Sequence, residues 1–166
     1  MTPDRLLNLA IRPAMIELEP LGVADTLDAR RFILAIALQE SGLMHRRQIG
    51  AAGEETGPAA SFWQFEQGGG CRGVLTHHAA APAMRRICAD FNVEPTVGGL
   101  WEAMRYNDIV AAAAARMLVC TLPHALPTTA AEGWVQYLVS WRPGKPRQQT
   151  WTANWDLATL VTGALP

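Results

Sequence analysis

Residues 26–42, TLDARRFILAIALQESG, form the stretch that decides the fold. Asp25 or Thr26 begins the predicted helix and Gly42 ends it, since these residue types are usual at the two ends of a helix. Residues four apart lie on one helix face, and Phe32, Ile36 and Glu40 form such a row. Apolar residues cover most of the remaining circumference, which is typical of a buried helix. The stretch therefore predicts a core helix that ends in a single carboxylic acid.

The position of Glu40 predicts a raised pKa. Burial disfavours the charged carboxylate, and the negative end of the helix dipole does the same. A glutamic acid that stays protonated near neutral pH is what glycosidic bond cleavage uses as its general acid. The alternative is a glutamate that simply turns out to solvent at the end of the helix.

The composition describes a packed chain without an overall basic surface. Its 166 residues are 49% hydrophobic and 17% charged, with a formal net charge of -1. The length predicts one domain spanning residues 1–166. The net charge argues against nucleic acid as a partner. No apolar stretch reaches the roughly 20 residues that a membrane span needs, so no stable membrane insertion is expected.

The cysteines do not predict a disulfide framework or a metal site. Cys71, Cys88 and Cys120 are odd in number and widely spaced, which is typical of reduced thiols in a protein folded in the cytosol. His77 and His78 lie between two of them, but the spacing differs from the tight Cys or His pairs of zinc sites. We therefore expect no metal and no cofactor.

Helical patterns recur on both sides of an irregular segment at about 43–73, which predicts a mainly α, α+β fold. Residues 61–66, SFWQFE, have aromatic strand character, and a short hairpin is expected there. Strand alternation would place Phe62 and Gln64 on one face and Trp63 on the other. The glycines at 68–70 predict a flexible hairpin turn or hinge. The first helix is expected from residue 2, with Pro13 as a kink or as its end, and the second from residue 25 or 26 to 41. Further helices are expected over residues 76–91, 97–105, 108–121, 129–141 and 151–161.

Three segments, in this order, resemble one group of enzymes. They are QESG at 39–42, AASFWQ at 59–64 and YLVSWRPG at 137–144. The order resembles the soluble lytic transglycosylases and goose-type lysozymes, which are lysozyme-like peptidoglycan glycosidases. Their pattern is a catalytic Glu-Ser at a helix end, a Gly-Ala-x-Gly-Leu-Met-Gln turn and a Tyr-Asn-x-Gly segment. The resemblance covers roughly residues 30–146. The chain resembles a distant member of this group, of phage or prophage type.

The letters of the three segments match unevenly. The Glu-Ser pair matches fully, and Ala59 and Gln64 match in the second segment. Ser61 stands where a glycine is usual, and Phe-Trp replaces Leu-Met after it. In the third segment Trp141 stands near the usual tyrosine, and Arg142 replaces the asparagine.

The resemblance implies a lysozyme-like helical domain that cleaves the MurNAc-GlcNAc β-1,4 bond, with Glu40 as general acid. In a transglycosylase the same group then takes the proton of the muramic C6 hydroxyl, which closes a 1,6-anhydro ring. In a lysozyme water is the acceptor, and a second acid often helps. Glu54, Glu55 and Glu66 lie in the irregular segment and are the candidates for that acid. Both outcomes stay open.

The remaining candidates for substrate contacts each have a simpler interpretation. Gln64 would bind an acetamido or hydroxyl group, or else face solvent. Ser41 would hold Glu40, or else bond locally at the helix end. Phe62 and Trp141 would stack on sugar rings, or else pack in the core. Ser61 is a further candidate for substrate contacts, because it belongs to the second segment.

A basic turn follows the acid. His45, Arg46 and Arg47 are suited to the carboxylates of muramic acid or of peptide stems, or else form a solvated turn. An arginine close to Glu40 would lower its pKa. The role as a general acid therefore requires these side chains to point away from it.

Two other classes of function remain open. One is a non-catalytic lysozyme-like protein that binds the wall or belongs to a virion structure, which is compatible with the altered second and third segments. An unrelated helical interaction protein predicts no cleft between the core helix and residues 57–66. The expected partner is the glycan strand of peptidoglycan. The first residues, MTPDRLLNLAIRPAM, carry no signal-peptide pattern. We expect synthesis in the cytoplasm and action at the cell wall or periplasm, after release or within a virion or secretion apparatus.

Overall fold

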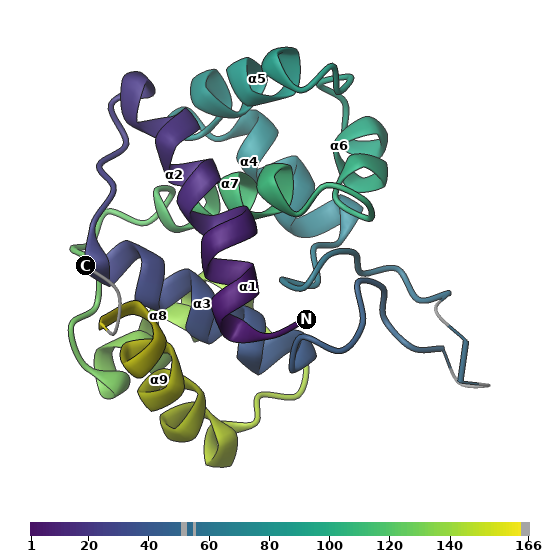
Figure 1. The fold of residues 1–166 in the computed structure, drawn as a ribbon. Coiled ribbons are helices and arrows are strands. Elements are labelled where there is room, and N and C mark those ends of the chain that lie inside the picture. The colour runs from purple at the N-terminus through teal and green to yellow at the C-terminus, as the bar shows by residue number, and fades with distance from the viewer. Residues whose placement is uncertain (51–52, 55, 164–166) are drawn as a thin grey trace.

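The fold is all-α in the part of the chain that the structure describes. The structure, a computed structural model, describes residues 1–50, 53–54 and 56–163 (Figure 1). The α-helices are α1 (Pro3–Leu6), α2 (Arg12–Leu18), α3 (Leu27–Ser41), α4 (Arg72–Thr76), α5 (Ala81–Asp90), α6 (Val97–Ala103), α7 (Asp108–Val119), α8 (Ala130–Trp141) and α9 (Gln148–Gly163). Short helical turns complete them: η1 (Leu7–Ile11), η2 (Glu19–Leu21) and η3 (Gln67–Cys71).

The predicted core helix is confirmed as α3. Thr26 caps it by accepting a hydrogen bond from the Ala29 N–H at 3.1 Å, and Gly42 ends it with a φ of 57°. The central residues of α3, 32–37, are fully buried. Its apolar surface packs along α9 and also contacts α7 and α1. Burying one such leucine or isoleucine stabilises the fold by about 1.5–3 kcal/mol.

Helix α7 lies among α2, α4 and α5, and it contributes an alanine-rich surface to them (Figure 1). All of its residues from Val110 to Val119 are buried. Asn107 caps the helix by accepting hydrogen bonds from the N–H groups of Ile109 and Val110. Small alanine side chains let the neighbouring helices approach this central element closely.

The predicted hairpin is wrong, since no strand occurs among the described residues. Only isolated bridges link Ala60 to Arg47 and to Phe65. The reason is a tight turn: Ser61 and Gln64 adopt positive φ angles of 66° and 52°, which no extended strand allows. Ala60 and Phe65 close the turn by exchanging two backbone hydrogen bonds of 2.9 and 2.7 Å.

The glycines at 68–70 form helical backbone instead of a hairpin turn. They belong to η3, which leads directly into α4. A Cβ atom at position 70 would lie 2.5 Å from the Phe65 ring, so only glycine fits there. This close approach brings the start of α4 against the turn at residues 60–65.

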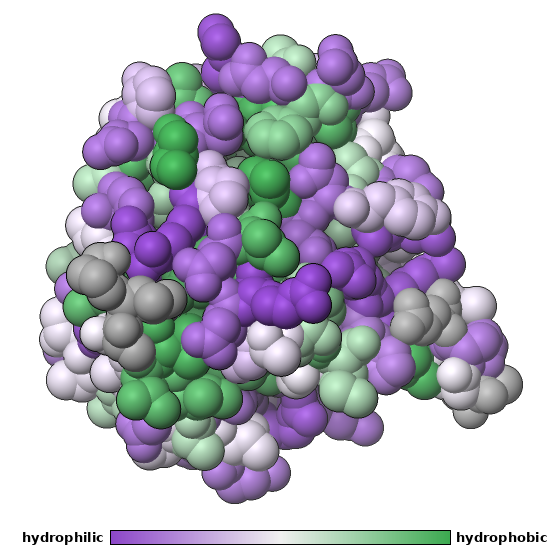
Figure 2. Space-filling model, in the orientation of Figure 1, coloured by the Kyte–Doolittle hydropathy of each residue, from purple (hydrophilic) through white to green (hydrophobic). Residues whose placement is uncertain are grey.

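The surface mixes polar and apolar residues. Figure 2 shows one face, on which hydrophilic residues predominate and apolar residues are interspersed. No helix in the described ranges is both long and apolar enough to cross a membrane.

Candidate functional site

A cleft of about 810 Å³ lies between the C-terminal end of α3, the turn at 60–65, the start of α4 and the C-terminal end of α8. Gln39 and Glu40 line it from α3, and Trp141 lines it from α8. The segment that joins α8 to α9 covers a further side. The end of the core helix, the second segment and the third segment therefore line one cleft.

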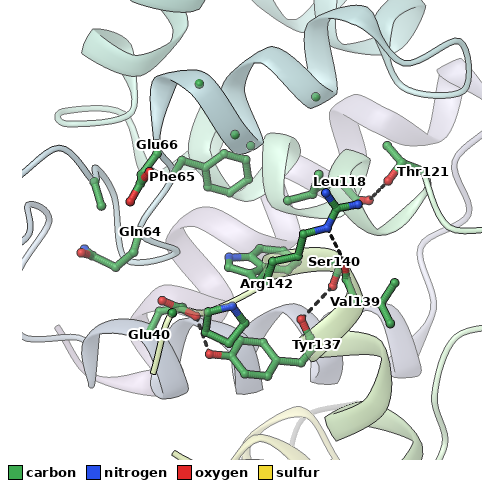
Figure 3. Close-up of a pocket in the computed structure, with 18 of the residues that line it drawn as sticks. Glu40, Gln64, Phe65, Glu66, Leu118, Thr121, Tyr137, Val139, Ser140 and Arg142 are labelled. Atoms are coloured by element: carbon green, nitrogen blue, oxygen red, sulfur yellow. Dashed lines mark hydrogen bonds between the residues drawn. The ribbon is translucent and has the colours of Figure 1, made fainter. Parts of the chain in front are cut away.

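Glu40 lies in the last turn of α3 and its carboxyl faces the cleft (Figure 3). Its Oε1 accepts a hydrogen bond of 2.6 Å from the hydroxyl of Tyr137. Burial raises the pKa of Glu40, while the Tyr137 hydrogen bond and the positive charge of Arg147 act in the opposite direction. Burial is the largest of these effects, so the carboxyl is a weaker acid than an ordinary glutamate.

Tyr137 fixes this carboxyl from α8. Its ring is buried and stacks on Trp151, with 5.2 Å between the ring centroids. Burial and the neighbouring Glu40 both raise the pKa of the tyrosine, which therefore remains a hydrogen-bond donor. One feature of the sequence points to this role: Tyr137 begins the third segment, and a buried tyrosine hydroxyl usually has a hydrogen-bond partner.

Gln39 precedes the acid and anchors α3 to α9. Its side chain is only 2% exposed. The amide nitrogen donates to the Arg147 carbonyl at 2.9 Å, and the amide oxygen accepts from Thr150 and Asn154 at 3.1 and 2.8 Å. Arg147 in turn donates to the Gln39 carbonyl at 2.6 Å. The apolar pattern of the sequence predicts that Gln39 lies on the helix, but it does not indicate these contacts.

Gln64 reaches the cleft from the turn, as expected of a substrate-binding candidate. Its amide nitrogen donates to the Ser61 carbonyl at 2.8 Å. Ser61 itself is fully buried and does not line the cleft. The Ser61 hydroxyl accepts a hydrogen bond from the Trp63 N–H at 3.2 Å and so shapes the turn.

The aromatic residues of the turn divide between core and cleft. Trp63 is fully buried, and its indole donates to the Ile33 carbonyl at 2.7 Å. Trp141 lines the cleft, and its indole donates to the Trp63 carbonyl at 2.9 Å. Phe62 lies in the core and not at the cleft, so the prediction that it shares a face with Gln64 is wrong. Strand alternation does not apply to a turn with positive φ angles.

The candidates for a second acid, and Ser41 beside Glu40, differ in their positions relative to the cleft. Glu66 is exposed and lines the cleft. Glu54 lies outside the cleft and accepts a hydrogen bond from Thr56 at 3.3 Å. Glu55 lies outside the described residues. Ser41 bonds locally, donating to the Ala37 carbonyl at 3.0 Å.

The two arginines of the basic turn after α3 bond to groups other than Glu40. Arg46 forms a two-pronged ion pair with Asp108, with distances of 2.9 and 2.7 Å. The guanidinium of Arg47 donates to the carbonyls of Gly57 and Thr56. The requirement that these arginines leave the pKa of Glu40 unaffected is met, since Arg147 is the only arginine that acts on it among the described residues.

The potential metal ligands do not converge. Among the described residues no three His, Cys, Asp or Glu side chains gather as a metal site would require. Cys71 and Cys88 are buried thiols, and burial raises the pKa of Cys71 to about 12. His77 and His78 stack on each other, with 4.4 Å between their ring centroids.

Comparison of the chain with protein-family models, curated proteins and solved structures gave no match. The function proposed below therefore rests on the geometry of the cleft.

Proposed function

We propose that the protein is a peptidoglycan glycosidase that cleaves the MurNAc-GlcNAc β-1,4 bond, with Glu40 as general acid. One observation carries this proposal: Glu40, with its pKa raised by burial, faces a cleft of about 810 Å³ and is held by Tyr137. A carboxylic acid kept protonated in a groove is suited to protonate a glycosidic oxygen. The cleft also disfavours the unrelated interaction protein, which predicts no groove at this place.

The hydrogen bond from Tyr137 suggests how the acid would act. It occupies Oε1 of Glu40 and leaves Oε2 for the glycosidic oxygen of the substrate. After Glu40 has given up its proton, the same bond stabilises the carboxylate, because a hydrogen bond to the charged form favours that form. The carboxylate would then accept a proton from the attacking hydroxyl, which belongs either to muramic C6 or to water.

The proposal covers a lytic transglycosylase and a lysozyme, both with a lysozyme-like helical arrangement. A transglycosylase needs no second acid. Among the described acids predicted for that role, only Glu66 lines the cleft, and it would serve the lysozyme outcome. Mass spectrometry of the soluble fragments distinguishes the two activities. Anhydro ends indicate a transglycosylase, and reducing ends indicate a lysozyme. We place the site of action at the bacterial cell wall, where the glycan strands lie.

The test is clearing of purified cell walls in a gel by the wild type and by Glu40→Gln. We expect the substitution to reduce the rate by about 100-fold or more, because it removes the transferable proton. Glu94→Gln, at an exposed position away from the cleft, is the matched control and should clear like the wild type. Circular dichroism verifies that all three proteins are folded.

Two results would contradict catalysis by Glu40. One is full clearing by folded Glu40→Gln. The other is an inactive, folded wild type that still binds insoluble cell walls, which would favour the non-catalytic wall-binding alternative.

A further inference from the structure

The charged residues of the cleft are mainly basic, although the whole chain has a net charge of -1. The basic residues are Arg72 at the start of α4, and Arg142, Lys145 and Arg147 in the segment between α8 and α9. Among the residues that the structure describes, the acids that line the same cleft are Glu40 and Glu66. The cleft is therefore suited to an anionic ligand.

These cations differ from other arginines of the protein in their pairing. Within the described part of the chain, none of the four forms an ion pair, and all four are exposed. Elsewhere, five arginines pair with an aspartate or glutamate: Arg30, Arg31, Arg46, Arg86 and Arg105. Arg147 donates to the Gln39 carbonyl and acts on Glu40, whereas Arg72, Arg142 and Lys145 keep their charges available to a ligand.

Arg142 has the most specific placement of the four. It ends α8 in the left-handed conformation, with φ 49° and ψ 52°, where glycine or asparagine is usual. Figure 3 shows its side chain reaching across the cleft toward Leu118 and Thr121. The Nε group donates to the Val139 carbonyl at 3.3 Å. Its two terminal amino groups donate to no described residue and remain free for a ligand.

We propose that this cationic side of the cleft, with Arg142 at its centre, binds the carboxylates of the peptide stems on the glycan strand. The inference rests on the proposed function and specifies its substrate as strands that carry stems. A planar guanidinium donates two parallel hydrogen bonds to one carboxylate, which neutral sugars do not offer. The stem peptide supplies such carboxylates beside the sugars.

The test is calorimetric titration with three ligands: the GlcNAc-MurNAc disaccharide with a tetrapeptide stem, the same disaccharide without the stem, and a neutral chitin oligomer. These disaccharides lack the bond that the proposed activity cleaves, so binding is measured without turnover. The variants are Arg142→Asn, which tolerates the left-handed backbone, and Arg85→Asn on α5, which removes an exposed charge away from the cleft.

We expect the wild type and Arg85→Asn to bind the stem-bearing disaccharide about tenfold more tightly than the other two ligands. Arg142→Asn should lose most of that preference and bind the neutral oligomer as before. Equal wild-type affinity for all three ligands would overturn the inference. Equal weakening of both disaccharides by Arg142→Asn would also overturn it, by pointing to the lactyl carboxylate or to the sugars.

The outcomes separate this inference from the proposed function. If the protein clears no cell wall but binds stem-bearing ligands through Arg142, the inference on stem binding is supported and the proposed glycosidase activity is rejected. If the protein clears cell walls in a Glu40-dependent way but binds all three ligands equally, the glycosidase activity is supported and stem binding is rejected.

Discussion

At the scale of the residue, Glu40 shows how three effects on one carboxyl combine. Burial raises its pKa and outweighs both the Tyr137 hydrogen bond and the charge of Arg147. The sequence predicted the helix end and the direction of the shift. It did not predict Tyr137, because a periodic pattern places a residue on a helix but does not say which distant residue it meets. The two side chains are 97 residues apart in the chain.

The raised pKa of Glu40 predicts that Glu40→Gln gains stability relative to the wild type as pH rises. Above the ordinary glutamate value of 4.5 the folded wild type holds this proton more tightly than the unfolded chain does. Wild-type stability therefore falls as pH rises from that value through the folded-state pKa, while glutamine has no such transition. Urea unfolding at about pH 4 and about pH 8 measures the difference.

Glu94→Gln is the control for losing an ordinary surface carboxylate. If the stability difference between Glu40→Gln and the wild type is the same at both pH values, or shrinks at the higher one, burial does not dominate at this site.

At the scale of the element, the helices were largely predictable and the turn at 60–65 was not. The segments predicted at 26–41, 108–121 and 129–141 correspond to α3, α7 and α8 within two residues at their ends. The turn departs from the strand propensity of its aromatic residues because tertiary contacts decide it. The Trp63 indole bonds to the Ile33 carbonyl on α3, and the Trp141 indole bonds to the Trp63 carbonyl. Local sequence does not contain those partners.

The contact between α3 and α9 gives a second stability prediction. Gln39→Ala removes three side-chain hydrogen bonds, to Arg147, Thr150 and Asn154, and empties the buried position that the Gln39 amide occupies. We expect a loss of about 2–4 kcal/mol in the free energy of unfolding, measured by denaturant titration. Gln149→Ala, at an exposed position of the same helix, should change stability by less than about 0.5 kcal/mol. Equal effects of the two substitutions would show that the buried amide does not anchor α9.

At the scale of the whole molecule, α7 is the helix around which much of the core is arranged. The alanines at 111–115 are fully buried, and α2, α4 and α5 pack around the helix. The sequence indicated a helix there, but an alanine run alone does not distinguish a central helix from a peripheral one. Its burial follows from contacts with residues before and after it in the chain.

Close packing around α7 predicts that Ala113→Leu destabilises the protein. The larger side chain has no space in a fully buried position and should cost about 1–3 kcal/mol. Ala131→Leu, at an exposed position of α8, makes the same chemical change and should cost less than about 0.5 kcal/mol. Thermal unfolding of both variants measures the contrast. A neutral Ala113→Leu would mean that the helices around α7 leave unfilled space.

The closure of Ala60 onto Phe65 has a consequence for behaviour at high concentration. The two residues satisfy each other's backbone groups, and the described residues contain no strand with an unpaired edge. An unpaired edge is the usual template on which one native chain recruits another into a fibril. While the turn is closed, these backbone groups are not available to another chain, so strand pairing through Ala60 or Phe65 would first require the turn to open.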